Sequence, residues 1–315
     1  MVVSMPSIAL LIPAYNAELY LPRLLRSAHA QREPFDEIWV YDDCSTDNTA
    51  LVAEGLGAQV LRGEVNQGCS AGKDALARHV EADWLHFHDA DDELLPNFVS
   101  LARKWIQHGA PDVVLFNFEY RDEETGELIL TARFDAEELQ RDPRSYAIRN
   151  QINAICGLYR RSAFLKAGGY DHVPEVLYNE DVACHIRLAF AGLTFGAESE
   201  ISIINYRRDG SMSAANQLKC LQSHLAVMCL TLAHPDAGPY REDIATKLWA
   251  VAGALAAYDD WGNARKAIVL ANEIIPPPAS AGSNMFRIIA RSNPHIALRL
   301  REHWIRIAKP HLRTP

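Results

Sequence analysis

Apolar runs of strand length alternate with amphipathic segments over the first 120 residues. The runs at 7–13, 37–41, 84–88 and 112–118, with a shorter one at 59–61, are separated by stretches with helical periodicity. Continuous apolar runs are typical of strands buried on both faces, and spacings of three and four are typical of helices. This alternation predicts an α/β fold, with a mostly parallel sheet flanked by helices through right-handed crossovers.

The pattern changes twice further along the chain. Residues 120–146 are charged and predict a hairpin or excursion, after which strands are expected at 155–160 and 201–206 and a helix at about 180–192. Beyond residue 215 only helical patterns remain, at about 218–233, 241–258, 264–273 and 296–308. We therefore expect an α/β domain over residues 1–214 and an all-helical C-terminal region over residues 215–315.

The composition narrows the class of protein. The 315 residues are 49% hydrophobic and 23% charged, as in ordinary soluble domains, and the net charge of -9 argues against a nucleic-acid partner. Six scattered cysteines without a Cys-x-x-Cys pair argue against a zinc ribbon or a disulfide framework. Without a recognisable secretory signal or an apolar run of eighteen residues, the chain is expected to be cytoplasmic.

Polar side chains gather where the predicted strands end. Asp89–Asp92 reads Asp-Ala-Asp-Asp directly after the run at 84–88, and Tyr15, Asp42 and Asp43 follow the first two strands. Ligands of open α/β sheets bind at the carboxyl ends of the strands. Carboxylates there suit Mg²⁺ or Mn²⁺ shared with phosphate groups, although the tetrapeptide alone could equally be an acidic turn that caps the next helix.

Other polar residues have a structural interpretation of their own. Glu180 and Asp181 stand in the first turn of a predicted helix, where acids interact favourably with the helix dipole. Asn16 fits the N-cap of the first helix. His86 and His88 alternate with apolar neighbours, which favours two buried, hydrogen-bonded histidines on one side of a strand over metal ligands.

Taken together, these motifs resemble the family 2 glycosyltransferases of the GT-A fold, which are inverting enzymes that use nucleotide sugars. The resemblance covers about residues 7–213. It rests on six motifs in the family's order, namely Ile12–Asn16, Asp42–Asp47, Asn66–Gly68, Asp89–Asp92, Glu180–Asp181 and Tyr206–Arg207.

The resemblance implies three sets of site residues. The nucleotide-binding set is Pro13, Ala14, Tyr15, Asp42, Asp43, Asn66, Lys73 and Asp89. The metal-binding set, for Mn²⁺ or Mg²⁺, is Asp91, Asp92 and Asp209. The catalytic set is Asp181 as general base, with Glu180 as the less favoured choice.

Some positions depart from the family's pattern. Cys44 replaces a glycine that usually follows the paired aspartates, and Asp209 stands where many members have a histidine. An aspartate there could bind metal but would repel a diphosphate. Cys44 and Cys69 fall in loops expected to flank the nucleotide, where both are interpreted as small, unreactive side chains. The departures at residues 44 and 209 support one alternative, a non-catalytic module that binds a nucleotide sugar.

The implied activity is an in-line transfer of a sugar from a nucleotide donor, most favourably a UDP-sugar, to a hydroxyl of a glycan or lipid-linked acceptor. A base removes the hydroxyl proton while a divalent metal neutralises the departing diphosphate. A sugar-nucleotide pyrophosphorylase is a weaker alternative, because it should carry a glycine-rich basic loop where this chain has Pro13–Asn16.

The last predicted helix is amphipathic and basic. Ile296, Leu300, Trp304 and Ile307 form one stripe, and Arg299, Arg301, Arg306 and Lys309 dominate the remainder. The favoured interpretation is that the stripe packs on its own domain or on a second subunit of a homodimer. The other is that residues 296–309 contact the cytoplasmic face of a membrane peripherally, which would suit a lipid-linked acceptor.

Overall fold

The computed structural model describes residues 5–208, 210–278 and 282–313. Its strands are β1 (Ile8–Ala14), β2 (Glu37–Asp42), β3 (Gln59–Arg62), β4 (Trp84–Phe87), β5 (Glu93–Leu94), β6 (Val113–Asp122), β7 (Leu128–Ala132), β8 (Gly157–Arg160) and β9 (Phe195–Arg207). Helices α1 (Leu21–His29), α2 (Thr49–Gly55), α3 (Cys69–His79), α4 (Phe98–Gln107), α5 (Ala136–Arg141), α6 (Pro143–Arg149), α7 (Arg161–Lys166) and α8 (Glu180–Phe190) accompany them. The helical part contains α9 (Met212–Ala215), α10 (Gln217–Leu232), α11 (Arg241–Ala257), α12 (Trp261–Asn272), α13 (Asn284–Ser292) and α14 (Pro294–Ala308).

The strands form one mixed sheet in the order β3-β2-β1-β4-β8-β6-β9-β5, with β7 paired to β6. Strands β1, β2, β3 and β4 are parallel, so their carboxyl ends meet at one edge, as the alternation of strands and helices predicts. The second half is mixed because β8 runs antiparallel to both β4 and β6. The charged excursion is the β6–β7 hairpin.

Two hydrophobic cores lie on the two faces of the sheet. Ile8, Leu10 and Ile12 of β1 face α1 and α4, whereas Ala9 and Leu11 face the side of α3 and α8. This alternation follows from the two-residue period of a strand. Both faces of β1 are therefore fully buried, which explains its uninterrupted apolar sequence.

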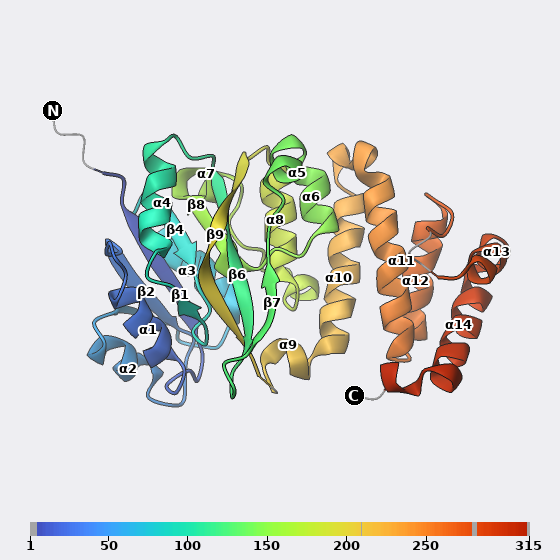
Figure 1. The fold of residues 1–315 in the computed structure, drawn as a ribbon, viewed down its shortest axis with the longest axis horizontal. Helices are drawn as coiled ribbons and strands as arrows, with labels where there is room; N and C mark the ends of the chain where they lie inside the picture. The colour runs from blue at the N-terminus through green and yellow to red at the C-terminus, as the bar shows by residue number, and fades with distance from the viewer. Residues whose placement is uncertain (1–4, 209, 279–281, 314–315) are drawn as a thin grey trace.

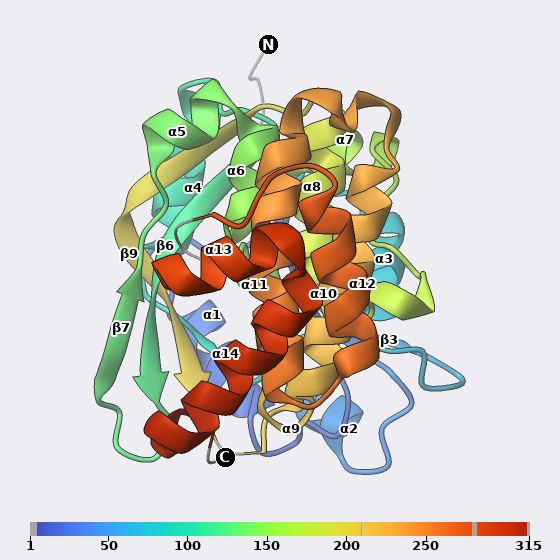
Figure 2. The ribbon, with the colours of Figure 1, turned by 90° about the vertical axis from the view of Figure 1, so that its right-hand side faces the viewer.

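The C-terminal helices extend one of these cores away from the sheet (Figure 1). Val182 of α8, Leu225 of α10, Leu248 of α11 and Ile268 of α12 belong to one continuous buried cluster. Helices α13 and α14 lie at the far end and face the viewer in Figure 2. The sheet thus holds the predicted strand-end residues, and the helices stack beside it.

One local prediction is wrong, and another is wrong in part. Asn16 does not cap α1, which begins at Leu21 after Tyr20; it adopts a left-handed φ of 48° instead, a conformation that asparagine tolerates well. The apolar stripe of α14 does not pack on its own domain, and its packing on a second subunit stays a prediction. Its members Leu300, Trp304 and Ile307 are more than half exposed, and the helix is anchored through its other face.

Candidate active site

The ends of β1 and β2 bring the first predicted nucleotide-binding residues together. Ala14 lies directly beside Asp42 in the parallel register, and Pro13 lies beside Tyr41. Pro13 and Ala14 are buried in the sheet, whereas Tyr15 is 51% exposed just beyond it. An exposed ring next to a strand end is free to cover a planar base.

Asp42 and Asp43 have different surroundings although both are buried. The carboxylate of Asp43 accepts hydrogen bonds from the backbone N–H of Gln67 at 2.9 Å and of Gly68 at 2.7 Å. Oδ1 of Asp42 accepts from the N–H of Ser45 at 3.0 Å, and Oδ2 accepts no hydrogen bond from another described residue. Asp43 therefore anchors the loop before α3, and Asp42 keeps an oxygen that a ligand could use.

The loops after β1 and β2 are tied to each other. Oδ1 of Asn16 accepts from the N–H of Thr46 at 2.9 Å, and the N–H of Asn16 donates to Oγ of Ser45 at 3.0 Å. Cys44 adopts a φ of 61°, the left-handed region in which glycine is favoured. The glycine that the family places here is thus replaced by a cysteine in a glycine-like conformation.

Lys73 of α3 lies under the predicted catalytic carboxylates rather than at an open surface. Its side chain is 1% exposed, and Nζ lies 3.1 Å from Oδ1 of Asp181 and 3.5 Å from Oε1 of Glu180. Nζ also lies 4.9 Å from the centre of the Tyr170 ring. Burial acts to lower the pKa of Lys73, but Asp181 and its other neighbours outweigh burial and hold that pKa well above its usual value.

Glu180 and Asp181 begin α8, so both interpretations of these acids are compatible with their position. The side chain of Asp181 is 21% exposed, whereas that of Glu180 is 8% exposed. Burial, assisted by the charge of Asp181, raises the pKa of Glu180 to about 7. His185, one turn along α8, interacts with the backbone oxygen of Asp181 at 2.7 Å and with the hydroxyl of Tyr159 at 2.8 Å. The first turn of α8 is thus firmly held, with Asp181 the more accessible acid.

Asp89, Asp91 and Asp92, which follow β4, have three different surroundings. Burial raises the pKa of Asp89 to about 6, with Lys73 opposing the rise and Asp181 adding to it. Asp92 is 1% exposed and accepts from Nδ2 of Asn205 at 2.7 Å and from the N–H of Tyr206 at 2.9 Å. Burial, followed by the charges of Asp91 and Asp89, raises the pKa of Asp92 well above its usual value.

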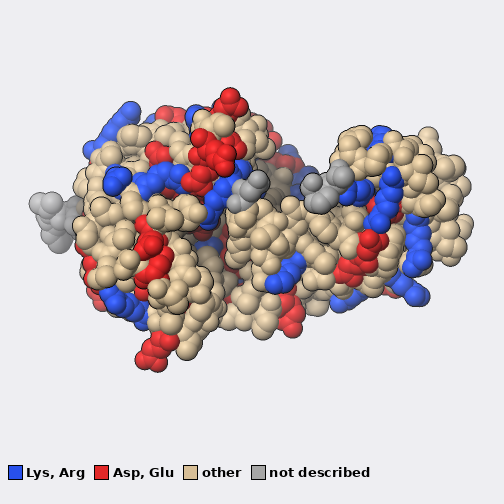
Figure 3. Space-filling view, turned by 90° about the horizontal axis from the view of Figure 1, so that it is seen from below, with Lys and Arg blue, Asp and Glu red and all other residues tan. Residues whose placement is uncertain are grey.

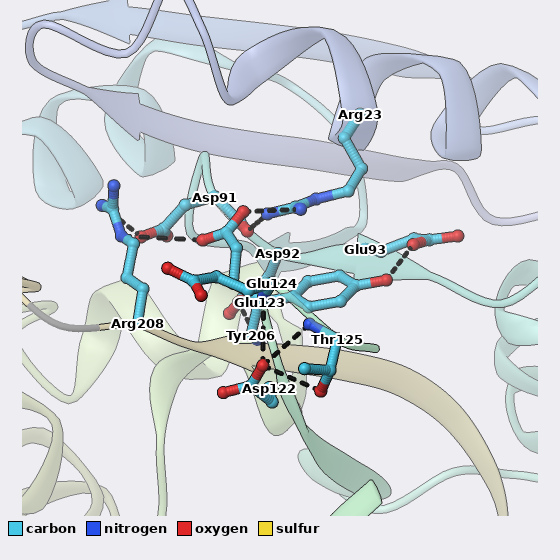
Figure 4. Close-up of polar contacts among 10 residues, drawn as sticks. All are labelled: Arg23, Asp91, Asp92, Glu93, Asp122, Glu123, Glu124, Thr125, Tyr206 and Arg208. Carbon is cyan, nitrogen blue, oxygen red and sulfur yellow. Dashed lines mark hydrogen bonds and ion pairs between the residues drawn. The ribbon is translucent and has the colours of Figure 1, made fainter. Parts of the chain in front are cut away.

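Asp91 is partly exposed, with 30% of its side chain accessible, and arginines surround it (Figure 4). Its carboxylate pairs with Arg208 at 2.8 Å, and its backbone oxygen accepts from Arg23. Both arginines also contact Glu123 in the β6–β7 hairpin, Arg23 at 2.7 Å and Arg208 at 3.8 Å. Arg23 and Arg208, which share Glu123, therefore surround the residue predicted to bind the metal.

The oxygen donors at this strand end fit a hard divalent cation. Within the described ranges no group of three or more His, Cys, Asp or Glu side chains forms a ready-made metal site. Mg²⁺ is usually held by one or two carboxylates together with phosphate oxygens, so Asp91 with Asp89 nearby is a suitable protein share. Both oxygens of Asp92 already accept hydrogen bonds, which favours Asp91 as the ligand.

The remaining predicted residues fall into two groups. Asn66 is exposed in the loop before α3, and Asp209 lies outside the described residues. Burial raises the pKa of the Cys69 thiol, and the charges acting on it include those of Lys73 and Asp89. Cys69 thus borders the site as a poorly ionised thiol, and Cys44 is exposed in the loop after β2.

The two histidines of the strand end are buried and hydrogen-bonded, as the sequence predicts. Nδ1 of His86 lies 2.9 Å from the backbone oxygen of Gly157, and Nε2 lies 3.0 Å from Nδ1 of His88. Burial lowers the pKa of His86 to about 4, so the pair is neutral at pH 7. They pack in the core and do not extend the acidic cluster.

Sequence reasoning missed the arginines. Arg208 directly follows the Tyr206–Arg207 motif, so its position was a usable signal. Arg23 stands on α1, 68 residues before Asp91, and nothing in its local sequence marks it.

The fold of the whole chain is that of known nucleotide-sugar enzymes. The structure of Staphylococcus aureus TarS residues 1–349 in complex with UDP-GlcNAc superimposes with a TM-score of 0.71 at 17% identity, covering 96% of this chain and 92% of that one. The mannosyltransferase PcManGT of Pyrobaculum calidifontis, in complex with GDP-Man and Mn²⁺, superimposes with a TM-score of 0.61 at 17% identity, covering 96% and 88%. The predicted GT-A type α/β fold with a helical C-terminal region is confirmed.

Sequence comparison gives the family. The model of glycosyl transferase family 2 matches residues 9–168, about half of the chain, so the chain belongs to this family and the resemblance is confirmed. An uncharacterized glycosyltransferase of Haemophilus influenzae is 26% identical over 169 residues, and TarS of S. aureus, a poly(ribitol-phosphate) beta-N-acetylglucosaminyltransferase, is 31% identical over 123 residues. These matches cover 51% and 36% of this chain but only 55% and 21% of the two relatives.

Proposed function

We propose that the chain is an inverting glycosyltransferase that moves a sugar from a UDP-sugar to a hydroxyl of a glycan or lipid-linked acceptor. The observation that carries the proposal is the clustering of Lys73, Asp181 and the acidic strand end from Asp89 to Asp92 at the carboxyl edge of the sheet. Relatives solved with UDP-GlcNAc, or with GDP-Man and Mn²⁺, support the donor class.

The donor nucleotide would lie along the ends of β1 and β2. The exposed ring of Tyr15 suits contact with the base, and the free oxygen of Asp42 suits a hydrogen bond from the imide N–H of uracil. Asp89, the neighbour that interacts with Lys73, is the proposed contact of the ribose. A donor bound by these residues would place its diphosphate next to Asp91.

A divalent cation, Mn²⁺ or Mg²⁺, held by Asp91 and the diphosphate would supply charge neutralisation for the leaving group. Arg208, now 2.8 Å from Asp91, stands close enough to contribute a further positive charge to the diphosphate. Asp92 holds the end of β9 in place through Asn205 and Tyr206.

Asp181 is the proposed general base. It would accept the acceptor's hydroxyl proton as the oxygen attacks the anomeric carbon, in one displacement that inverts the configuration. Nζ of Lys73 lies 3.1 Å from this carboxylate and holds it in position. Glu180 is more deeply buried, which makes it the weaker candidate.

The test is a screen of nucleotide sugars by thermal unfolding and by donor turnover, with Mn²⁺ and with EDTA. A donor that binds the native protein raises its melting temperature, and this rise should need the metal. Asp181→Asn should lower turnover by at least about a hundredfold while leaving the donor-induced rise intact, the scale expected for loss of a general base. Asp91→Asn should weaken the metal-dependent rise itself.

Asp236→Asn is the matched control, since Asp236 is exposed in the helical part far from these residues in the sequence. It should behave like the wild type in both assays. Donor binding without turnover in the wild type would favour the non-catalytic module, and no response to any donor would contradict both functions.

A further inference from the structure

The end of the molecule formed by α13 and α14 exposes large apolar side chains (Figure 2). Trp304 is 57% exposed and Ile307 is 68% exposed, although both belong to a well-formed helix. The other exposed members are Met285, Ile288, Ile296, Leu300 and Leu312. We call these seven residues and the cations between them the end face. Isolated exposed apolar residues are common, but a set concentrated on two adjacent helices indicates an interaction surface.

The same two helices concentrate positive charge. Residues 284–313 contain seven Lys and Arg residues and one acid, so they carry +6 in a chain whose net charge is -9. Figure 3 shows several of the blue side chains at its right-hand end, where the C-terminal helices lie. The remainder of the chain therefore carries -15, and the end face is a basic region on an acidic protein.

The single acid of the segment is buried and pairs with two of the seven cations. Glu302 is 1% exposed, and its carboxylate accepts from Arg313 at 2.7 Å and from Arg306 at 3.0 Å. These hydrogen bonds from Arg313 and Arg306 lower the pKa of Glu302 against the effect of burial. Arg306 and Arg313 thus brace α14 internally.

Other cations remain available at the surface. Arg299 lies over the ring of Trp261 at 5.0 Å, and Lys309 lies over the ring of Trp304 at 5.7 Å. Neither forms an ion pair with another described residue, and Arg291 is likewise exposed. The charges of Arg291, Arg299 and Lys309 are therefore available to a binding partner of the end face.

The charge distribution distinguishes between the two surfaces that could cover these residues. A two-fold dimer would bring the same patch of both copies together, so that +6 would face +6. An anionic bilayer offers the opposite charge to the cations and an apolar layer to the tryptophan and aliphatic side chains. Helices with this combination lie in the plane of the membrane interface.

We infer that the end face binds the surface of an anionic lipid bilayer and holds the protein there peripherally. Within the described ranges no helix is long and apolar enough to cross a bilayer. In Figure 1 the end face lies at the right-hand end of the molecule, whereas β1 and β2 lie at the left. This binding does not depend on the proposed activity.

The test is co-sedimentation of the full chain with vesicles of phosphatidylcholine alone and of phosphatidylcholine mixed with phosphatidylglycerol. Binding to the anionic vesicles should be strong at low salt, weak at high salt and absent with the neutral ones. Each cation near the surface contributes about fivefold to partitioning, so R291E with K309E should weaken binding by well over tenfold. R141E with K104E, at exposed cations of α5 and α4, is the charge-matched control and should bind like the wild type.

The apolar contribution has a control of its own. Ile307→Ser should weaken binding severalfold, whereas Leu51→Ser should not, because Leu51 is 63% exposed on α2 away from the end face and Ile307 is 68% exposed on it. Both variants change an exposed side chain, so both should fold, and circular dichroism verifies this.

Two results would overturn the inference. One is failure of the folded wild type to bind anionic vesicles at low salt. The other is that light scattering shows a stable oligomer which Ile307→Ser dissociates, while the wild type and this variant bind vesicles equally. The end face would then be a contact between copies of the chain.

Discussion

Lys73 organises the charges of the candidate site. One ammonium group, 1% exposed, lies between two carboxylates at the start of α8 and beneath the acidic end of β4. A buried charge is costly unless it is paired, so each acid here depends on this cation. Asp181, Glu180 and Asp89 all interact with this one cation. Burial raises the pKa of Glu180 to about 7.

The raised pKa of Glu180 predicts a stability change with pH. The native protein holds this proton more tightly than the unfolded chain, whose glutamate has a pKa near 4.5, so stability falls as pH rises from about 4.5 to 7. Glu180→Gln removes this cost and should raise the free energy of unfolding by about 1–3 kcal/mol at pH 8 but by much less at pH 5. Urea unfolding at both pH values measures the difference.

Glu175→Gln provides the control for this pH effect, because Glu175 is exposed in the connection just before α8. Its stability relative to the wild type should be the same at both pH values. A gain for Glu180→Gln that is equal at pH 5 and pH 8 would mean that the proton on Glu180 is not the cause.

At the scale of elements, α3 packs so closely against the sheet that one of its positions must be glycine. A Cβ atom on Gly72 would lie 2.8 Å from Cδ1 of Tyr41 in β2 and 3.3 Å from Cβ of Pro13 in β1. This close approach brings the next residue, Lys73, beneath the site. The small-residue turn that opens α3 is therefore a packing requirement as well as a loop signal.

Gly72→Ala should destabilise the protein by about 1–3 kcal/mol, because overpacking outweighs the better helix propensity of alanine. Gly55→Ala is the matched control: Gly55 ends α2, and a Cβ there would have no neighbour within 4 Å. That change should be neutral or stabilise by up to about 1 kcal/mol. Chemical denaturation of both variants measures the effect, and equal stabilities would contradict the packing argument.

Elements with a local signal could be predicted from the sequence, and those held by distant contacts could not. The apolar runs of β1 and β4 and the acids that follow β4 were sufficient to place the sheet edge and its polar residues. Strand β9 is twice as long as the pattern indicates, because Glu198, Ser199 and Glu200 interrupt its apolar half. The Nε1–H of Trp105 donates a hydrogen bond of 2.8 Å to the carboxylate of Glu198, and the two residues are 93 positions apart in the sequence.

The same distinction applies within the candidate site. The carboxylates could be named because each follows a strand or opens a helix. The pairing of Arg208 with Asp91 spans 117 residues, and that of Lys73 with Asp181 spans 108. The choice of partner depends on how β9, α3 and α8 are arranged around the sheet, which periodicity does not encode.

At the scale of the whole molecule, the helical region and the α/β part share one core. Ile186 and Phe190 of α8 belong to the same buried cluster as Leu225 of α10 and Leu248 of α11. This cluster crosses residue 215, where the sequence predicts a domain boundary. The predicted division at residue 215 describes the change in composition. Whether the two parts fold independently stays a prediction.

Truncation tests whether the α/β part depends on the first C-terminal helices. A chain of residues 1–214 would expose Ile186 and Phe190 of α8 to water, at a cost of about 3–6 kcal/mol for these two side chains, which is a large share of the roughly 5–15 kcal/mol by which a domain is stable. We expect it to show no cooperative thermal unfolding. A chain of residues 1–278 keeps α10, α11 and α12 and should unfold cooperatively at a lower temperature than the full chain.

The longer truncation should also separate the two proposals. It lacks the end face but retains Lys73, Asp91 and Asp181, so a UDP-sugar with Mn²⁺ should still raise its melting temperature while binding to anionic vesicles is lost. Cooperative unfolding of residues 1–214 with an undiminished response to the donor would show that the α/β part is independent of the helices. Vesicle binding by residues 1–278 equal to that of the full chain would place the lipid contact outside α13 and α14.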